Sequence, residues 1–386
     1  MPQHTSSQSW TFSDVDADVH LADFRIEPRD NFSFGTRTLR GGLREGVEVV
    51  EVDNGCLRFI ILPTRGMGLW RAWRGELEIG WQSPVKGPVH PKFVPLAEPS
   101  GIGWLSGFDE LLCRCGLEYN GAPEWGADGR LKHSLHGRIA NLPAHKVVAT
   151  FDPTIDEIAI SGAVDEARLF GNNLRLTSTY RTRLGEPKLT IVDEIENISA
   201  RPADLELLYH INIGPPLAMA GSRLEAPIAT LAPKDAHSAS EMSDWHRYSS
   251  EKSGVQEAVF FFELAADAEG RTGVLLTERD GGRGVSLKFN RRQFPFFTLW
   301  KNPQALADGY CTGLEPCINF PNVKSFEKAN GRVATLAPGE KRRFEIEMEV
   351  HDTADAIRRT HDAIAEWQRP TQPKIYDCPR ADWSPR

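Results

Sequence analysis

The sequence predicts one large all-β domain, built as a sandwich or a barrel, and three observations support this prediction. Short runs alternate apolar and polar residues, as in residues 189–198 and 343–350. Gly, Pro, Asn and Asp separate these runs at short intervals. Helical patterns are few, and the best one lies near the C-terminus. Regular short strands with turn signals between them are typical of sandwiches and barrels.

The alternation indicates strands with one buried and one solvent-facing side. In residues 343–350, Phe344, Ile346 and Met348 alternate with arginine and glutamate residues. In residues 189–198, Leu189 and Ile191 begin an apolar side of the same kind. Because successive side chains of a strand point to opposite faces, both runs are predicted to be half-buried strands.

A hairpin is predicted at residues 47–62. The β-rich run Val47–Val52 is followed by Asp53-Asn54-Gly55 and then by a second run, Cys56–Leu62. An Asn-Gly step supplies the positive φ values that tight hairpin turns need.

One helix is predicted at Thr353–Gln368, with Asp352 or Thr353 as its cap and Pro370 and Pro373 after its end. The proline-rich residues 82–100 are expected to form a long ordered loop. The chain is therefore divided into an N-terminal extension packed on the core (1–44), a β domain (45–352) and a C-terminal helix and tail (353–386).

Composition excludes several classes of protein. The 386 residues carry a net charge of −8, which disfavours a nucleic-acid partner and gives no attraction to an anionic membrane. No apolar run of about 18 residues is present, and the first residues lack the pattern of a signal peptide. The six cysteines are sparse and do not form a disulfide pattern. We expect a cytoplasmic protein with free thiols, whose oligomeric state is open and compatible with a homodimer.

Three segments combine a titratable residue with unusual neighbours, and each is expected to be a strand. The first contains His133, Ser134, His136 and Arg138. The HxxH spacing suggests a metal, but residues three apart on a strand point to opposite faces, so no metal site is predicted. His136 and Arg138 would share a face and suit sugar hydroxyls. The alternative is a histidine that is hydrogen-bonded to a neighbouring loop.

The second segment contains His210 and Asn212, which would share a face of a strand ending at Gly214-Pro215-Pro216. A buried histidine has a pKa that its surroundings can move across neutral pH, as a general acid requires. A core histidine with its hydrogen bonds satisfied is an equally good interpretation.

The third segment places Glu315 beside Leu314 and Pro316. A carboxylate in apolar surroundings is costly, and desolvation would raise its pKa and make it a better base. The alternative is a structural ion pair with Lys301 or an arginine.

Together, and in this order, the three segments resemble the galactose mutarotase-like (aldose 1-epimerase) superfamily. Its members carry a Leu-His-Gly strand, a second histidine followed two residues later by Asn, and a late Leu-Glu-Pro strand. Here these are Leu135–Gly137, His210 with Asn212, and Leu314–Pro316. Residues 192–199 are similar to the strand that leads to the second histidine.

The resemblance covers about residues 45–350 and implies an antiparallel β-supersandwich with few short helices. Segments such as Leu62–Gly68 and Cys115–Leu117 are similar to those of one branch, DUF4432. The family's sugar-holding aspartate and arginine have no clear motif in this chain. Asp244 is the candidate for the aspartate, and Arg65, Arg114 or Arg138 for the arginine.

The resemblance implies an isomerase of carbohydrate metabolism that interconverts the anomers of a free sugar, without a cofactor or a metal. Glu315 would be the base and His210 the acid, while His136 and Asn212 would belong to the sugar-binding set. Two alternatives stay open, a carbohydrate-binding protein without turnover and another sugar isomerase or lyase that uses the same cleft.

Overall fold

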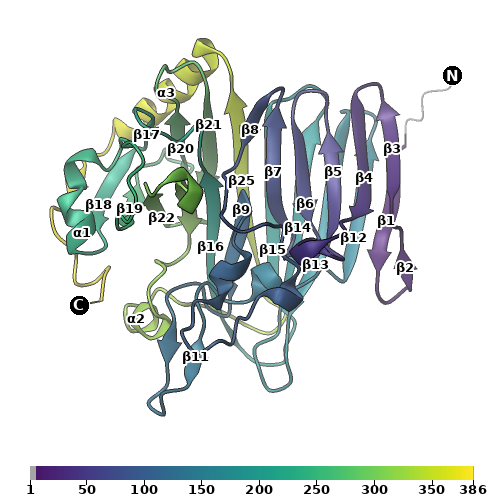
Figure 1. Ribbon diagram of the computed structural model, residues 1–386, viewed down its shortest axis with the longest axis horizontal. Coiled ribbons are helices and arrows are strands. Elements are labelled where there is room, and N and C mark those ends of the chain that lie inside the picture. Colours follow the sequence, from purple (N-terminus) through teal and green to yellow (C-terminus); the bar gives the residue numbers. More distant parts are fainter. Residues whose placement is uncertain (1–5, 386) are drawn as a thin grey trace.

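Two long β-sheets face each other in the computed structural model, which describes residues 6–385 (Figure 1). The first sheet has ten strands in the order β17 (Arg223–Glu225), β20 (Arg271–Thr277), β21 (Gly284–Asn290), β25 (Lys341–His351), β15 (Lys188–Asn197), β14 (Leu174–Arg183), β13 (Glu157–Glu166), β12 (Lys146–Asp152), β1 (Gln8–Asp14) and β2 (Val19–His20).

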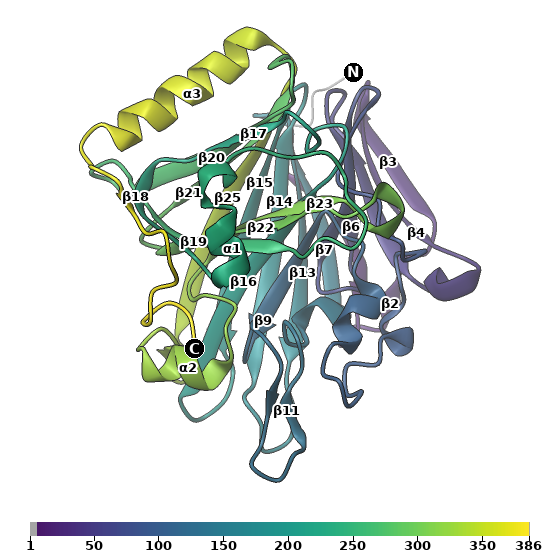
Figure 2. The same cartoon turned by 60° about the vertical axis from the view of Figure 1, so that its left-hand side comes forward.

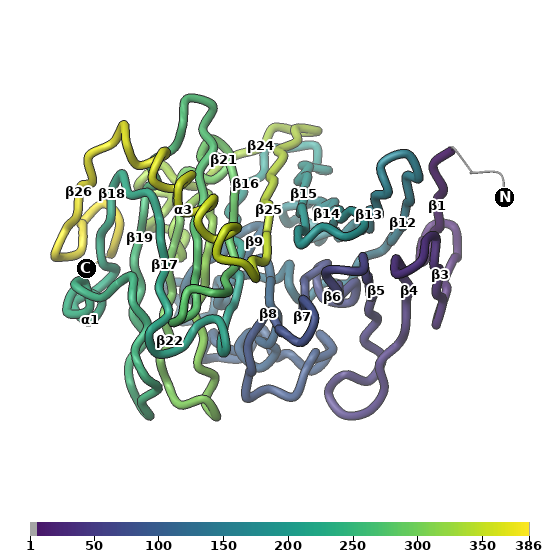
Figure 3. Tube along the Cα trace, turned by 90° about the horizontal axis from the view of Figure 1, so that it is seen from above, coloured from purple at the N-terminus to yellow at the C-terminus, as the bar shows by residue number. Residues whose placement is uncertain are grey.

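The second sheet has fourteen strands. Its main order is β26 (Lys374–Ile375), β18 (Ile228–Pro233), β19 (Ala258–Leu264), β22 (Phe296–Asn302), β23 (Cys311–Cys317), β16 (Ala203–Ile213), β9 (Leu112–Leu117), β7 (Gly68–Arg74), β6 (Arg58–Leu62), β5 (Glu48–Asp53), β4 (Phe32–Thr38) and β3 (Phe24–Arg29). In addition, β8 (Leu77–Ile79) pairs with β7 and β24 (Ala334–Leu336) with β16. Seen from above, the N-terminal strands and the β18–β19 region lie at opposite ends of the molecule (Figure 3).

The remaining elements are short. A small hairpin joins β10 (Glu124–Trp125) to β11 (Leu131–His133). The α-helices are α1 (Ala236–Ser240), α2 (Lys324–Ala329) and α3 (Ala354–Gln368). The 3-10 helices are η1 (Gly42–Arg44), η2 (Pro91–Phe93), η3 (Gly103–Gly107), η4 (Ile139–Asn141), η5 (Met242–Asp244) and η6 (Leu306–Asp308). The predicted all-β fold with few helices is thus confirmed.

The strand and hairpin predictions are confirmed in detail. The two alternating runs become β15 and β25, which are antiparallel neighbours with Ile191 opposite Ile346. Both residues are buried in the core between the sheets. The predicted hairpin is β5 and β6, joined by residues 54–57, in which Gly55 takes a φ of +82°.

The C-terminal helix is present as predicted. The side chain of Thr353, rather than that of Asp352, accepts the hydrogen bond from the backbone N–H of Ala356 and so caps α3. The helix lies along the outside of the molecule beside β20 (Figure 2). No helix of residues 6–385 is long and apolar enough to cross a membrane.

The N-terminal residues contribute strands to both sheets. β1 and β2 extend the first sheet beyond β12, while β3 and β4 extend the second sheet beyond β5. Residues 8–38 are therefore continuous with the sheets. The boundaries of the three predicted segments stay a prediction, and residues 1–5 and 386 lie outside the described part of the chain.

Candidate active site

The register of the second sheet brings His210 and Glu315 together. Strands β16 and β23 are antiparallel neighbours with Ile211 opposite Leu314, which places His210 opposite Glu315. The Nε2 atom of His210 lies 3.2 Å from Oε1 of Glu315, and both side chains are buried. On the neighbouring strands, Cys113 is the partner of His210 and Thr298 that of Glu315. His210 and Glu315 thus belong to one row of paired residues that runs across the strands β9, β16, β23 and β22.

Asn212 fixes the orientation of the His210 ring. Its side-chain nitrogen donates to the backbone carbonyls of Glu110 (2.9 Å) and His210 (3.1 Å). These two acceptors settle which end of the amide is oxygen. The oxygen therefore accepts from Nδ1–H of His210. In the neutral ring the proton is then on Nδ1, and Nε2 presents a lone pair toward Glu315.

The surroundings push the two pKa values in opposite directions. Burial, and then the neighbouring His136, lower the pKa of His210 to about 3. Burial raises the pKa of Glu315 well above its usual range, and Cys115 and Glu257 add to the shift. Since a protonated carboxyl beside a neutral imidazole is the favoured state, the pair holds one proton near neutral pH.

Two buried polar atoms at this site have no protein partner. Oε1 of Glu315 and Nε1 of Trp104 make no hydrogen bond of acceptable geometry within residues 6–385. An unsatisfied buried polar group is costly and calls for an explanation. Both side chains line the same cavity, where a ligand would meet an acceptor and a donor.

Gly313 makes room for the pair, although the sequence analysis did not single it out. It precedes Glu315 by two residues on β23 and lies opposite Asn212. A Cβ atom at this position would overlap Oε1 of Glu315 and would lie 3.0 Å from Cε1 of His210. Its Gly-x-Glu spacing on a strand is the signal that could have revealed it, because residues two apart share a face.

If Glu315 takes part in the anomer exchange that the sequence resemblance implies, Gly313→Ala should slow that exchange by at least about 10-fold, because the added methyl displaces Glu315 and a misplacement of about 1 Å can cost up to 10²-fold. The measurement is the rate of anomer exchange, alongside the free energy of unfolding. Gly282→Ala is the control, since its Cβ would lie 3.4 Å from the nearest atom outside its chain neighbours. An unchanged rate in Gly313→Ala would show that the position of Glu315 does not limit the reaction.

His136 reaches the site from a turn, so the prediction that it lies on a strand is wrong. Its φ is +58° and that of Gly137 is +74°, values that belong to left-handed turns. A Cβ at Gly137 would overlap the carbonyl oxygens of Gly116 and Tyr119. Only glycine fits this close approach, which explains the Leu-His-Gly sequence.

The turn places the ring of His136 against Trp104, with 4.7 Å between the ring centroids, and 5.5 Å from the ring of His210. Nδ1–H donates to the carbonyl of Asn120 at 2.8 Å, which leaves Nε2 for another partner. Burial lowers the pKa of His136, but Cys115 and the Asn120 carbonyl outweigh it, and the net pKa is raised. The ring is therefore held closer to its cationic form than His210 is.

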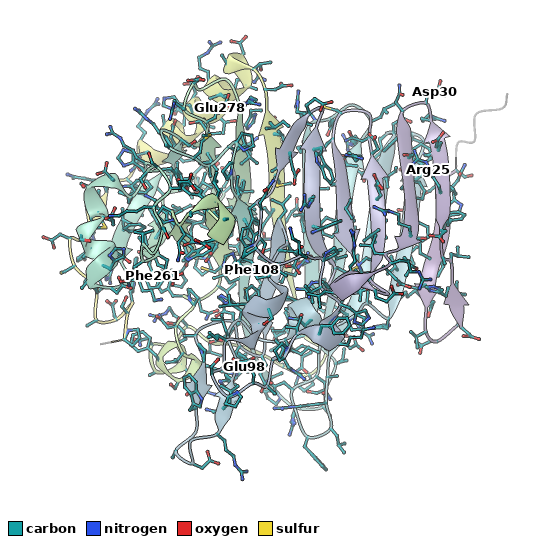
Figure 4. All side chains as sticks on the ribbon, viewed as in Figure 1. Arg25, Asp30, Glu98, Phe108, Phe261 and Glu278 are labelled. Carbon is teal, nitrogen blue, oxygen red and sulfur yellow. The ribbon has the colours of Figure 1, made fainter. Side chains whose placement is uncertain are left out.

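The three residues open on one cavity of about 290 Å³ that is continuous with solvent. Trp104, Phe108 and Trp300 supply aromatic walls, and the ring of Phe108 lies 5.0 Å from that of His210. Phe108 is near the middle of the molecule in Figure 4. The other lining residues are Ile102, Leu105, Ala122, Leu135, Lys234, Glu257, Val259, Thr298 and Pro321. Concave, mostly apolar sites with a few convergent polar groups are typical of small-ligand binding.

Arg65 lies beneath the site and does not line the cavity. Its Nε donates to Glu110 at 2.6 Å. Its two terminal nitrogens donate to the carbonyls of Val89 and Gly107 and to the side chain of Asn141. The buried guanidinium thus ties together the loops around the cavity.

Arg114 lies between the two sheets. It forms a two-point ion pair with Asp193 of β15, and both side chains are fully buried. Further hydrogen bonds run to Ser178 and to the carbonyl of Met67. Because Arg114 is on β9 of the second sheet and its partners Asp193 and Ser178 are on strands of the first, these contacts join the two sheets.

Arg138 and Asp244 are not among the residues that line the cavity. Arg138 is the residue immediately before η4, and its backbone N–H donates to the carbonyl of Gly116. Asp244 lies in η5 and lines a different depression, next to Lys301. Lys301 donates to two backbone carbonyls there, so it is not the ion-pair partner considered for Glu315.

His133 does not line the cavity that His136 lines. Its ring stacks on Tyr119 and pairs with Glu124 at 3.2 Å. Among residues 6–385, no group of three or more His, Cys, Asp and Glu side chains is placed to hold a metal ion.

Comparison with known proteins assigns the family. The family model described as "Domain of unknown function (DUF4432)" matches residues 44–350. The chain belongs to this family. A crystal structure from Klebsiella pneumoniae named a "putative aldose 1-epimerase" is 29% identical to this DUF4432 protein, with a TM-score of 0.92, and the match covers 96% of this chain and 98% of that one.

Two more distant structures share the fold of this DUF4432 protein. A galactose mutarotase-like protein from Clostridium acetobutylicum is 14% identical, with a TM-score of 0.57 and coverage of 84% of this chain and 100% of that one. A galactose 1-epimerase from Lactobacillus acidophilus is 12% identical, with a TM-score of 0.54 and coverage of 83% and 99%. No curated protein sequence matches the chain. The predicted superfamily and its DUF4432 branch are thus confirmed.

Proposed function

We propose that this DUF4432 protein is an aldose 1-epimerase that interconverts the α and β anomers of a free sugar. The observation that carries the proposal is the buried pair of His210 and Glu315, 3.2 Å apart, on an open cavity with aromatic walls. The name of the Klebsiella pneumoniae relative is consistent with this activity.

The reaction needs one group that takes the proton of the C1 hydroxyl and another that protonates the ring oxygen. With one proton on the pair, the form that reacts has a carboxylate on Glu315 and an imidazolium on His210, whose Nε2 lies 3.2 Å from Oε1 of Glu315. The carboxylate then removes the hydroxyl proton as the bond between C1 and the ring oxygen breaks, and the imidazolium protonates that oxygen. Rotation about the C1–C2 bond and the reverse steps give the other anomer.

The remaining groups bind and orient the sugar. Trp104 and Trp300 offer apolar surfaces to the C–H faces of the ring, and the unpartnered N–H of Trp104 can donate to a hydroxyl. His136, whose pKa is raised, can donate from Nε2 and so stabilise negative charge near the ring oxygen. These roles need neither a cofactor nor a metal.

The test is anomer exchange, followed by polarimetry or NMR saturation transfer over a panel of neutral aldoses, uronic acids and sugar phosphates. The expected result is acceleration above the uncatalysed rate for at least one sugar. A sugar that binds in the cavity without faster exchange would instead identify a binding protein, and conversion to another product would identify a different isomerase or a lyase.

The pH dependence offers a sharper check on the shared proton. We expect the rate to stay constant while the pair holds one proton and to fall on the acid side only as His210 gains a second, at a pH near its pKa of about 3. The measurement is the rate against pH, corrected for the uncatalysed reaction. An acid limb near 4.5 or 6.5, the ordinary values for Glu and His, would show that the two groups titrate independently.

A further inference from the structure

The cavity is lined by one lysine, Lys234, whose ammonium makes no direct ion pair or hydrogen bond with the described residues. The buried and partly buried lysines are Lys188, Lys234, Lys288, Lys301 and Lys324. Lys188, Lys288 and Lys324 form ion pairs with carboxylates, and Lys301 donates to two backbone carbonyls. Within residues 6–385, the ammonium of Lys234 has neither a salt bridge nor a hydrogen bond, and its side chain lines the cavity.

The backbone holds Lys234 in this place. The residue follows β18, and its N–H donates to the carbonyl of Val259 on β19 at 2.9 Å. The next residue, Asp235, caps α1. The residue is partly buried, and its ammonium, without a protein partner in residues 6–385, is available to a ligand.

The other charges of the lining do not cancel this one locally. Glu257, at the exposed rim, accepts a hydrogen bond from Trp300 at 2.7 Å and lies more than 4.0 Å from the Lys234 ammonium. Glu315 and His210 together are neutral when they share one proton. The raised pKa of His136 is caused mainly by Cys115, whose lowered pKa of about 6 makes it the counter-charge to that ring. An anionic group is thus favoured beside Lys234.

The number of cationic side chains that line the cavity indicates how much negative charge the ligand's anionic group carries. No arginine lines the cavity in the described part of the chain. Phosphate esters carry close to two negative charges and are usually bound by several Arg, Lys or backbone N–H groups. One lysine matches a single negative charge. In a uronic acid the carboxylate is attached to C5, and C5 is bonded to the ring oxygen. A single cavity can therefore hold the carboxylate and the reacting hemiacetal of the same sugar.

We propose that Lys234 binds a carboxylate of the sugar, so that the substrate is a uronic acid rather than a neutral aldose or a sugar phosphate. The inference rests on the proposed function for the placement of the sugar ring. It deepens that function by naming the substrate class.

The test is calorimetric affinity for three sugars of matched configuration: a neutral hexose, the hexuronate and the hexose 6-phosphate. We expect the wild-type protein to bind the hexuronate at least about 10-fold more tightly than the other two. Lys234→Met should abolish this preference, and Lys234→Arg should keep most of it. Lys374→Met is the matched control, since it removes the same charge from an exposed residue of β26 outside the cavity.

Several results would overturn the proposal: equal or tighter binding of the neutral hexose, tighter binding of the phosphate, a preference that survives in Lys234→Met, or no binding of the three sugars. The outcome is separate from that of the proposed function. Preferential binding of the hexuronate without anomer exchange would contradict the epimerase activity alone. Exchange of neutral sugars without a preference would contradict only the assignment of Lys234.

Discussion

Replacing Glu315 with glutamine should slow anomerisation by about 10²-fold to 10⁴-fold, the usual contribution of a general acid–base group. Glutamine keeps the size of the side chain but cannot take up the hydroxyl proton, nor can it share a proton with His210. The sugar affinity should change little, because the ring is held mainly by the aromatic walls and the other polar groups. The measurement is NMR exchange between anomers, with affinity determined in parallel.

His210→Asn should lower the rate of anomerisation by a similar factor, because it removes the general acid. The double variant should lose less than the product of the two single losses, because residues that share one proton act as a unit. Glu345→Gln, on the exposed face of β25, controls for loss of a carboxylate and should leave the rate unchanged. Rates near wild type for both single variants, on a sugar that the protein turns over, would assign His210 and Glu315 a structural role.

The faces of the strands could be predicted from the sequence, but their register could not. Alternation places Asn212 on the same face as His210, and the hydrogen bond between the two bears this out. The contact between His210 and Glu315 depends instead on the pairing of β16 with β23, strands that are about a hundred residues apart in the chain. Local patterns contain no information on which strands become neighbours.

Turn conformation explains why the first segment was misassigned. His136 lies between residues that look like a short strand, yet its φ is positive and the chain reverses there. Gly137 was the available signal, since glycine often marks such a position. The positions of Lys234 and Glu257 in the cavity lining could not be predicted, because nothing in the neighbouring sequence distinguishes these residues from solvated surface charges.

The arginines show a different limit of sequence analysis. An arginine in a family motif can bind a ligand or hold the fold, and only its partners decide between the two. Arg65 pairs with Glu110 and Arg114 with Asp193, which is 79 positions away along the chain. Both arginines are buried and neither lines the cavity, so the geometry favours a structural role.

Replacing Arg114 with methionine should therefore lower the free energy of unfolding by about 3–5 kcal/mol, as expected when one partner of a buried ion pair is removed. Methionine fills most of the space, but it leaves the carboxylate of Asp193 between the sheets without its cation. Tyr209 and Ser178 would also lose part of their hydrogen-bonded network. The measurement is urea unfolding at neutral pH.

Arg175→Met is the matched control. Arg175 forms a two-point pair with Asp165 on the partly exposed face of β14, where removal should cost only about 0–1 kcal/mol. The double variant Arg114→Met with Asp193→Leu should recover much of the lost stability, because it removes the uncompensated charge together with its partner. If Arg114→Met instead left stability unchanged and weakened sugar binding, Arg114 would be a ligand-binding residue that reaches the sugar in a state of the protein different from this one.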